Sequence, residues 1–97
     1  MAFTQTITVN NSGYTAVTVQ SPATKNIRIG EDPGVGGYPT TDFYIAKPTN
    51  AATPIRVTAG NSYVFFTVGG LFVQGQIVGY VKTVSGSTTF DQDEDQP

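Results

Sequence analysis

The chain has 97 residues, of which 38% are hydrophobic and 12% are charged, and its formal net charge is −2. It contains neither histidine nor cysteine, which excludes a Ser-His-Asp triad, a thiol nucleophile, a disulfide and the common zinc ligand sets. We therefore expect a protein that is not an enzyme and that has no cofactor and no metal site.

The first strand signal is Phe3–Val9, where apolar residues alternate with threonines. Asn10–Gly13 favours a turn, and Tyr14–Val19 resumes the alternation, so we predict a β-hairpin from these two segments. Seven further short strand patterns follow: 25–29, 43–45, 55–57, 63–68, 71–73, 76–84 and 88–90.

This spacing of strand patterns predicts the fold class. Between about seven and nine short strands, separated by turn signals, are typical of an all-β domain, either a small β-sandwich or a barrel with mostly antiparallel strands. Both remain open, because the order of strands in a sheet is not visible in the sequence. The hydrophobic fraction is below the usual share, so we expect part of the apolar surface to be buried only in an assembly.

The segment from Gly30 to Thr41 holds four glycines and two prolines, which predicts an irregular loop. It contains Glu31 and Asp32, an adjacent acidic pair that leaves acid–base catalysis, as in glycoside hydrolysis, as the remaining enzymatic alternative. We favour an ordinary turn there, because Asp32 is followed by proline and glycine.

Aromatic residues are the main candidates for contact with a partner. Tyr63–Val68 is almost entirely apolar, which suits a strand buried on both faces or one with a face in an interface. The predicted interface residues are Tyr63, Phe65, Phe66, Phe3, Tyr38 and Phe43. Alternatively, exposed rings form a sugar-binding platform in a carbohydrate-binding or adhesin-like module, with candidates Tyr14, Tyr38, Phe43, Tyr44, Tyr63 and Tyr80.

Charge is distributed unevenly along the chain. Residues 1–90 carry five Lys or Arg and three acidic residues, whereas residues 91–97 carry four acidic residues and no cation. So few cations exclude nucleic-acid binding, because each neutralised phosphate needs its own Lys or Arg. We predict a single β domain over residues 1–90 and an acidic, flexible tail over residues 91–97. Its candidate contacts with a neighbouring subunit are Asp91, Asp93, Glu94 and Asp95.

No targeting or membrane segment is apparent. The start, MAFTQTITV, has neither a basic region nor a continuous apolar region, so we expect no secretory signal. No run approaches the roughly 18 apolar residues that a membrane span requires, so we expect no membrane partner.

Several of these features occur together in one known group of proteins. The strand at 26–29, the glycine- and proline-rich loop at 32–37, the strand at 43–45 and the turn and strand at 57–63 come in an order that resembles small virion proteins of tailed bacteriophages. This resemblance runs from about Thr18 to Phe90 and includes the capsid decoration, or cement, proteins.

The resemblance implies a structural protein of the virion, made in the host cytoplasm and bound to the capsid exterior. Such proteins bind the major capsid protein or another virion protein, stabilise joints between capsid subunits, and are often trimers. A homo-oligomer, with a trimer favoured, is therefore expected. Other members of the group lie at the neck, tail or fibre, and those locations remain alternatives.

Overall fold

The computed structural model describes residues 2–30, 40–48, 53–67 and 69–95. Most of the predicted loop at Gly30–Thr41 lies outside these residues, including Glu31, Asp32 and Tyr38. Ten strands and no helix are found in the described residues, so the predicted all-β fold class is confirmed. The strands are β1 (Ala2–Val9), β2 (Thr15–Thr18), β3 (Ala23–Thr24), β4 (Asn26–Gly30), β5 (Phe43–Ala46), β6 (Ile55–Val57), β7 (Tyr63–Phe66), β8 (Phe72–Val73), β9 (Ile77–Thr83) and β10 (Thr88–Asp95). Across the described ranges, no helix has the length and hydropathy that crossing a membrane would need.

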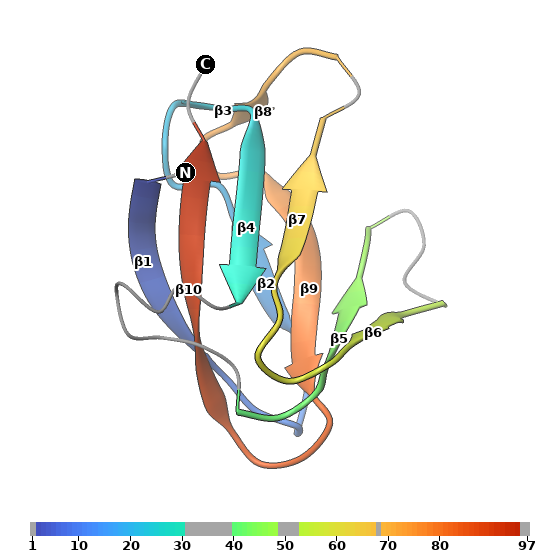
Figure 1. Ribbon diagram of the computed structural model, residues 1–97. Coiled ribbons are helices and arrows are strands. Elements are labelled where there is room, and N and C mark those ends of the chain that lie inside the picture. Colours follow the sequence, from blue (N-terminus) through green and yellow to red (C-terminus); the bar gives the residue numbers. More distant parts are fainter. Residues whose placement is uncertain (1, 31–39, 49–52, 68, 96–97) are drawn as a thin grey trace.

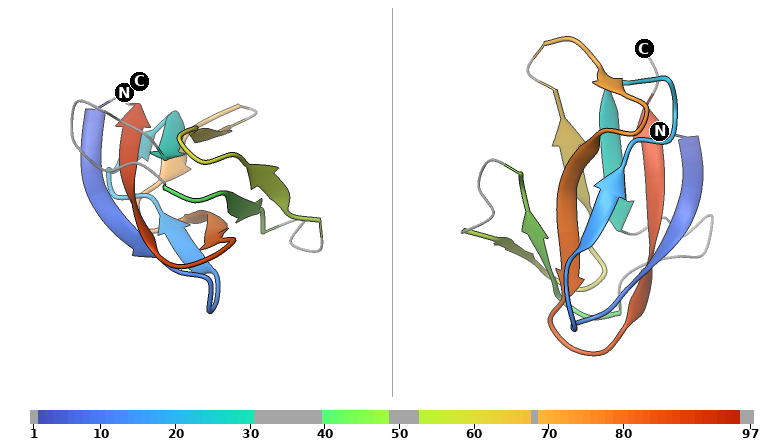
Figure 2. Two further views of the ribbon diagram at one scale, coloured as in Figure 1. Left: turned by 60° about the horizontal axis from the view of Figure 1, so that its bottom comes forward. Right: turned by 180° about the vertical axis from the view of Figure 1, so that it is seen from behind.

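The strands form two four-stranded sheets that face each other (Figures 1 and 2). The first sheet has the order β1-β10-β4-β7 and the second β2-β9-β5-β6, and all their pairs are antiparallel. A two-stranded ladder of β3 and β8 lies at one end. Buried side chains from both sheets form one core: Val9, Val17, Val19, Ile27, Ile29, Phe43, Ile45, Phe65, Val78, Val81 and Phe90. The domain is therefore a β-sandwich.

Alternation along each strand explains how the core forms. In β4, Ile27 and Ile29 are fully buried, whereas Asn26 and Arg28, which alternate with them, are half-buried on the outer face. The rings of Phe43 in β5 and Phe90 in β10 lie edge to face with their centroids 4.7 Å apart, which joins the two sheets.

The predicted hairpin of the first two strands is wrong. β1 pairs with β10, whereas β2 pairs with β9 in the other sheet, so the turn at Asn10–Gly13 carries the chain from one sheet to the other. The connection between β9 and β10 crosses at the same end (Figure 1). The backbone N–H of Thr83 donates to the carbonyl of Asn10 across the two connections (3.3 Å). Alternation shows which face of a strand is buried but not which strand lies beside it.

The predicted flexible tail is also wrong, as far as Asp95. β10 extends to Asp95 and lies between β1 and β4, inside the first sheet. Only Gln96 and Pro97 of the predicted tail lie outside the described residues. The acidic composition suggested self-repulsion, but the carboxylates have partners in the rest of the chain.

Candidate functional site

Glu94 lies in β10 on the same face as the core residue Ile27, and it is 1% exposed. Its Oε1 accepts hydrogen bonds from the backbone N–H of Ser21 (3.0 Å) and the hydroxyl of Thr24 (2.9 Å). Its Oε2 accepts from the backbone N–H of Gln20 (2.9 Å) and from the side-chain amide of Gln92 (2.8 Å). The carboxylate therefore holds the segment after β2 against β10.

The same hydrogen bonds keep Glu94 ionised. Burial alone would raise the pKa of Glu94, but the bonds from Gln20, Gln92, Ser21 and Thr24 together outweigh it and hold the pKa below its ordinary value. These four partners are neutral donors, and a buried carboxylate with every lone pair in use is suited to holding the fold rather than to accepting a proton from a substrate.

Gln92 extends this polar network to both edges of the sandwich. Its amide nitrogen also donates to the carbonyl of Thr18 (2.8 Å), and its oxygen accepts from the side-chain amide of Gln5 in β1 (3.0 Å). Gln92 is fully buried. Its position between Gln5 and Glu94 therefore ties β1, β2 and β10 together.

The other acidic residues of β10 also have partners in their own chain. Asp93 is 1% exposed and forms an ion pair with Arg28 of β4, with Oδ2 at 2.7 Å from Nη2. Two further side-chain contacts join Asn26 to Asp95 (3.1 Å) and Thr6 to Asp91 (3.4 Å). The predicted docking of these carboxylates on a neighbouring subunit therefore fails together with the predicted tail.

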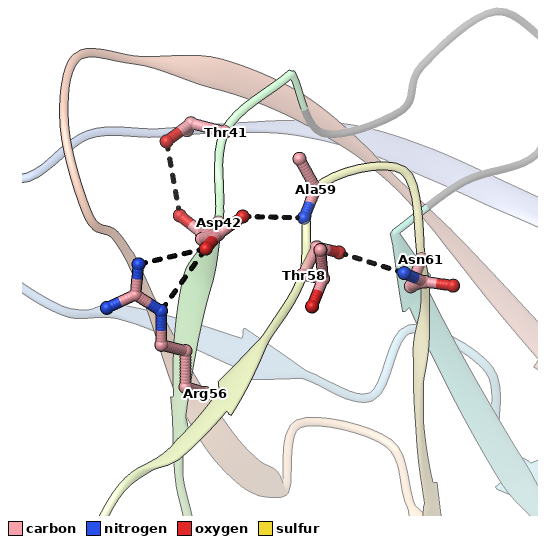
Figure 3. Close-up of polar contacts among 6 residues, drawn as sticks. All are labelled: Thr41, Asp42, Arg56, Thr58, Ala59 and Asn61. Atoms are coloured by element: carbon pink, nitrogen blue, oxygen red, sulfur yellow. Dashed lines mark hydrogen bonds and ion pairs between the residues drawn. The ribbon is translucent and has the colours of Figure 1, made fainter.

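A second polar cluster surrounds Asp42, at the start of β5 (Figure 3). Its Oδ1 accepts from the backbone N–H of Ala59 (2.9 Å), and its Oδ2 accepts from Arg56 of β6 (2.9 Å). The bonds from Ala59 and Arg56 hold the pKa of Asp42 below its ordinary value, and the bond to Asp42 raises the pKa of Arg56. The cluster secures the connection from β6 to β7.

Neither polar cluster resembles a catalytic or metal site. No group of three or more His, Cys, Asp or Glu that could hold a metal ion occurs in the part of the chain that the structure describes. The polar groups bond mainly to backbone and to one another, which is the arrangement expected of structural polar contacts.

The best candidate site is apolar and lies at β7, the last strand of the first sheet (Figure 1). Phe65 points into the core and is 5% exposed, whereas Phe66 points outward and is 66% exposed. A pocket of about 220 Å³ adjoins the strand, lined by Lys47, Pro48, Tyr63, Val64, Phe65, Phe66, Phe72 and Val78. The ammonium group of Lys47 lies 5.8 Å from the centre of the Tyr63 ring.

Five large apolar side chains are exposed at this pocket or next to it, and we call them the β7 patch. Two of them line the pocket, and each of the other three directly adjoins a lining residue in the sequence. Their exposed fractions run from 36% to 66%. The β7 patch consists of Val64, Phe66, Leu71, Val73 and Ile77. It carries no charged side chain.

The predicted interface residues divide into three groups. Tyr63, Phe65 and Phe66 lie together on β7, at the pocket. Phe43 is fully buried in the core, so its assignment to an interface is wrong. The other two predicted residues lie outside what the structure describes: the side chain of Phe3, in β1, and the whole of Tyr38.

Three members of the β7 patch were neither among the predicted interface residues nor in the predicted contact strand at 63–68. Leu71, Val73 and Ile77 lie on or beside short strands, where an apolar residue reads as a core residue. The one usable signal was the almost entirely apolar run at 63–68, which is too apolar for a strand with one solvated face.

Another aromatic surface lies on the outer face of the second sheet. Tyr44 of β5 pairs with Lys82 on one side and with Arg56 on the other. The guanidinium of Arg56 lies 5.8 Å from the Tyr44 ring centre, and the ammonium of Lys82 lies 4.8 Å from that of Tyr14. Tyr80 points to the same face as Lys82.

Comparison with known proteins gives no relative: no family model, no curated protein and no solved structure matches this chain.

Proposed function

We propose that this chain is a non-enzymatic structural protein of a bacteriophage particle. Its role is that of a capsid decoration protein, which binds the outside of the assembled shell and stabilises joints between capsid subunits. The resemblance of its order of strands and loops to small virion proteins suggests the particle. The observation that carries an assembly role is the β7 patch, five exposed apolar side chains on β7 and on the segment 71–77 that follows it.

An assembly role also agrees with the chemistry of the chain. Without histidine or cysteine, the candidates for proton transfer are carboxylates, and Asp42, Asp93 and Glu94 are engaged in contacts that hold strands together. A decoration protein needs no reaction. It gains from repetition, because many copies on one shell convert weak single contacts into strong overall binding.

The test is binding to particles. Shells of the phage that encodes the chain, prepared without this protein, are mixed with purified protein and sedimented, and their melting temperature is measured with and without it. We expect stoichiometric co-sedimentation and a higher melting temperature, with density on the capsid exterior by cryo-electron microscopy. Density at the neck, tail or fibre would move the role to that structure, and a protein that never sediments with particles would refute the proposal.

A carbohydrate-binding module is the second candidate, favoured by the tyrosines on the outer face of the second sheet. Two of these rings already have cations over them, which leaves less free ring surface for a sugar to stack on. A glycan array with the Tyr44→Ala and Tyr80→Ala variants tests it. Sugar binding that both substitutions abolish would favour this candidate over the first.

A further inference from the structure

The two sheets have four edge strands, and three of them carry features that block pairing with another strand. β1 has a bulge between Phe3 and Gln5, and the ladder of β2 with β9 is irregular between Val17 and Thr18, where β9 carries the extra residue. β6 follows Pro54 and carries Arg56. The fourth edge strand is β7.

β7 carries none of these protective features. Its pairing with β4 is continuous from Tyr63 to Phe66, without a bulge. The strand contains no proline and no charge, and its sequence is YVFF. Among the described residues, no strand pairs with its second edge, which is therefore a template for main-chain hydrogen bonds.

The faces of β7 are apolar as well. Val64 and Phe66 alternate with Tyr63 and Phe65, so the first pair lies on the outer face of the sheet and the second pair on the inner face. The exposed parts of the β7 patch add up to roughly 400 Å² of apolar surface, from the usual side-chain areas. A standard interface buries about 800 Å² per partner, of which about 57% is non-polar. Val64 and Phe66 supply the part of this apolar surface that lies on β7 itself.

We propose that β7 pairs antiparallel with β7 of a second copy of this chain. A twofold axis perpendicular to the sheet joins the two first sheets into one continuous sheet of eight strands. In the register centred on Phe65, outer faces stay together and Val64 of one copy lies opposite Phe66 of the other, an aromatic and β-branched pair of the kind that stabilises sheets.

A second copy fits this edge because the edge is complementary to itself. A twofold interface brings the same surface together twice, so any charge on it would face its own kind. The β7 patch has no charge, and the nearby Lys47 is directed over the ring of Tyr63. This pairing makes the basic unit a dimer, in place of the trimer that the resemblance implies.

The inference deepens the proposed assembly role and rests on it for its biological purpose, but it is tested without particles. Analytical ultracentrifugation of the purified chain should show a dimer. Val64→Lys and Phe66→Lys each place a lysine on an exposed position of β7, and we expect each to raise the dissociation constant at least about tenfold. Ile55→Lys is the matched control, because Ile55 is 41% exposed on a different edge strand, β6. It should leave the dimer intact.

Circular dichroism shows whether each variant is folded, and cross-linking tests the register without a charged residue. The chain has no cysteine of its own. A mixture of Val64→Cys and Phe66→Cys chains should therefore form a mixed disulfide dimer under mild oxidation. A wild-type monomer, a dimer that Ile55→Lys disrupts equally, or a mixture without mixed disulfides would overturn the proposed pairing. Shell binding by a protein that stays monomeric would leave the proposed function standing and remove only this inference.

Discussion

A carboxylate that is almost completely buried, Glu94, holds one end of the sandwich together. Removing a charge from water is costly, and in this chain the cost is offset by four hydrogen-bond donors. Two of the donors are backbone N–H groups of Gln20 and Ser21, where the chain leaves β2 and has no strand partner. Glu94 therefore replaces the ladder that a longer β2 would have supplied.

Glu94→Gln tests this anchor. The amide keeps the size of the side chain but directs an NH₂ group at other donors, so we expect a loss of about 2–3 kcal/mol in the free energy of unfolding. Urea denaturation at neutral pH measures it, with Asp95→Asn as the control at a half-buried neighbouring position. Equal stability of Glu94→Gln and wild type would show that the anchor is unimportant.

The pH dependence of stability has a defined sign for Glu94. Its pKa is lower in the folded chain than its ordinary value of 4.5, so it stabilises the fold above about pH 4.5. That contribution is lost as pH falls from there through the folded pKa. Glu94→Gln should remove this part of the acid dependence, and an unchanged acid profile in urea titrations would contradict the assignment.

Gly79 is required for a different reason, the close approach of the two sheets. A Cβ atom added there would lie 2.5 Å from Cε1 of the Phe65 ring, which packs over this position from the opposite sheet. We expect Gly79→Ala to cost about 1–3 kcal/mol in the free energy of unfolding, because the ring must move. Gly13→Ala is the control, since nothing lies within 4 Å of the added atom. Thermal unfolding that is unchanged in Gly79→Ala would refute the packing argument.

At the scale of elements, the sandwich depends on connections that pass between the sheets. The segment from β6 to β7 is one of these, and β7 is the open edge on which the proposed dimer rests. Asp42 fixes that segment through the N–H of Ala59 and through Arg56, as Figure 3 shows. We call these two contacts of Asp42 the Asp42 clamp. Through it, the second sheet helps to fix the position of β7.

Two substitutions separate the two contacts of the Asp42 clamp, the hydrogen bond from the Ala59 N–H and the ion pair with Arg56. Asp42→Ala removes the acceptor, so the Ala59 amide should exchange with solvent faster, whereas Arg56→Ala leaves that hydrogen bond in place and should change the exchange little. Hydrogen exchange followed by NMR measures both. Because the pKa of Asp42 lies below its ordinary value, the protection should persist at pH 5. Equal exchange rates in the two variants would contradict this account.

At the scale of the whole molecule, the first sheet is organised around β10. This strand pairs with β1 on one side and with β4 on the other. Its inward side chains, Phe90, Gln92 and Glu94, reach the core, the end of β2 and the segment after it. The C-terminal part of the chain is therefore needed for both sheets.

Removal of residues 91–97 should unfold the protein. The deletion removes most of β10 and so exposes the edges of β1 and β4. It also leaves Ile27 and Ile29 without the strand that pairs with them. We expect the loss of chemical-shift dispersion in NMR spectra and of the β signal in circular dichroism, at all temperatures. A truncated chain that stays folded would restore the interpretation of these residues as a separate tail.

The strands were largely predictable, because alternation of apolar and polar residues is a local property. The segments that contain β4, β5, β6 and β7 were all predicted within a few residues. β3, with two residues, was too short to leave a pattern. The last strand was predicted to end at Phe90, five residues too early. The reason is that Asp91–Asp95 has the composition of a solvated segment and gains its stability only from partners far away in the sequence.

The candidate site was predictable only in part. The apolar run of β7 pointed to a contact strand, and Phe66 is exposed there, whereas Phe43 has the same local pattern and is fully buried. The difference arises because Phe43 points into the core between the sheets, whereas Phe66 points outward from β7. Strand order depends on contacts between distant segments, which no local pattern records.

The sequence by itself therefore determined that this protein is an all-β domain and that it contains neither histidine nor cysteine. The first follows from the period of apolar residues, and the second from composition. Only the tertiary structure decided that the acidic C-terminus is a central strand, that the first two strands lie in different sheets, and that β7 is an open edge. Each of these depends on which distant residues meet, because a buried carboxylate or an exposed phenylalanine is defined by its neighbours in space.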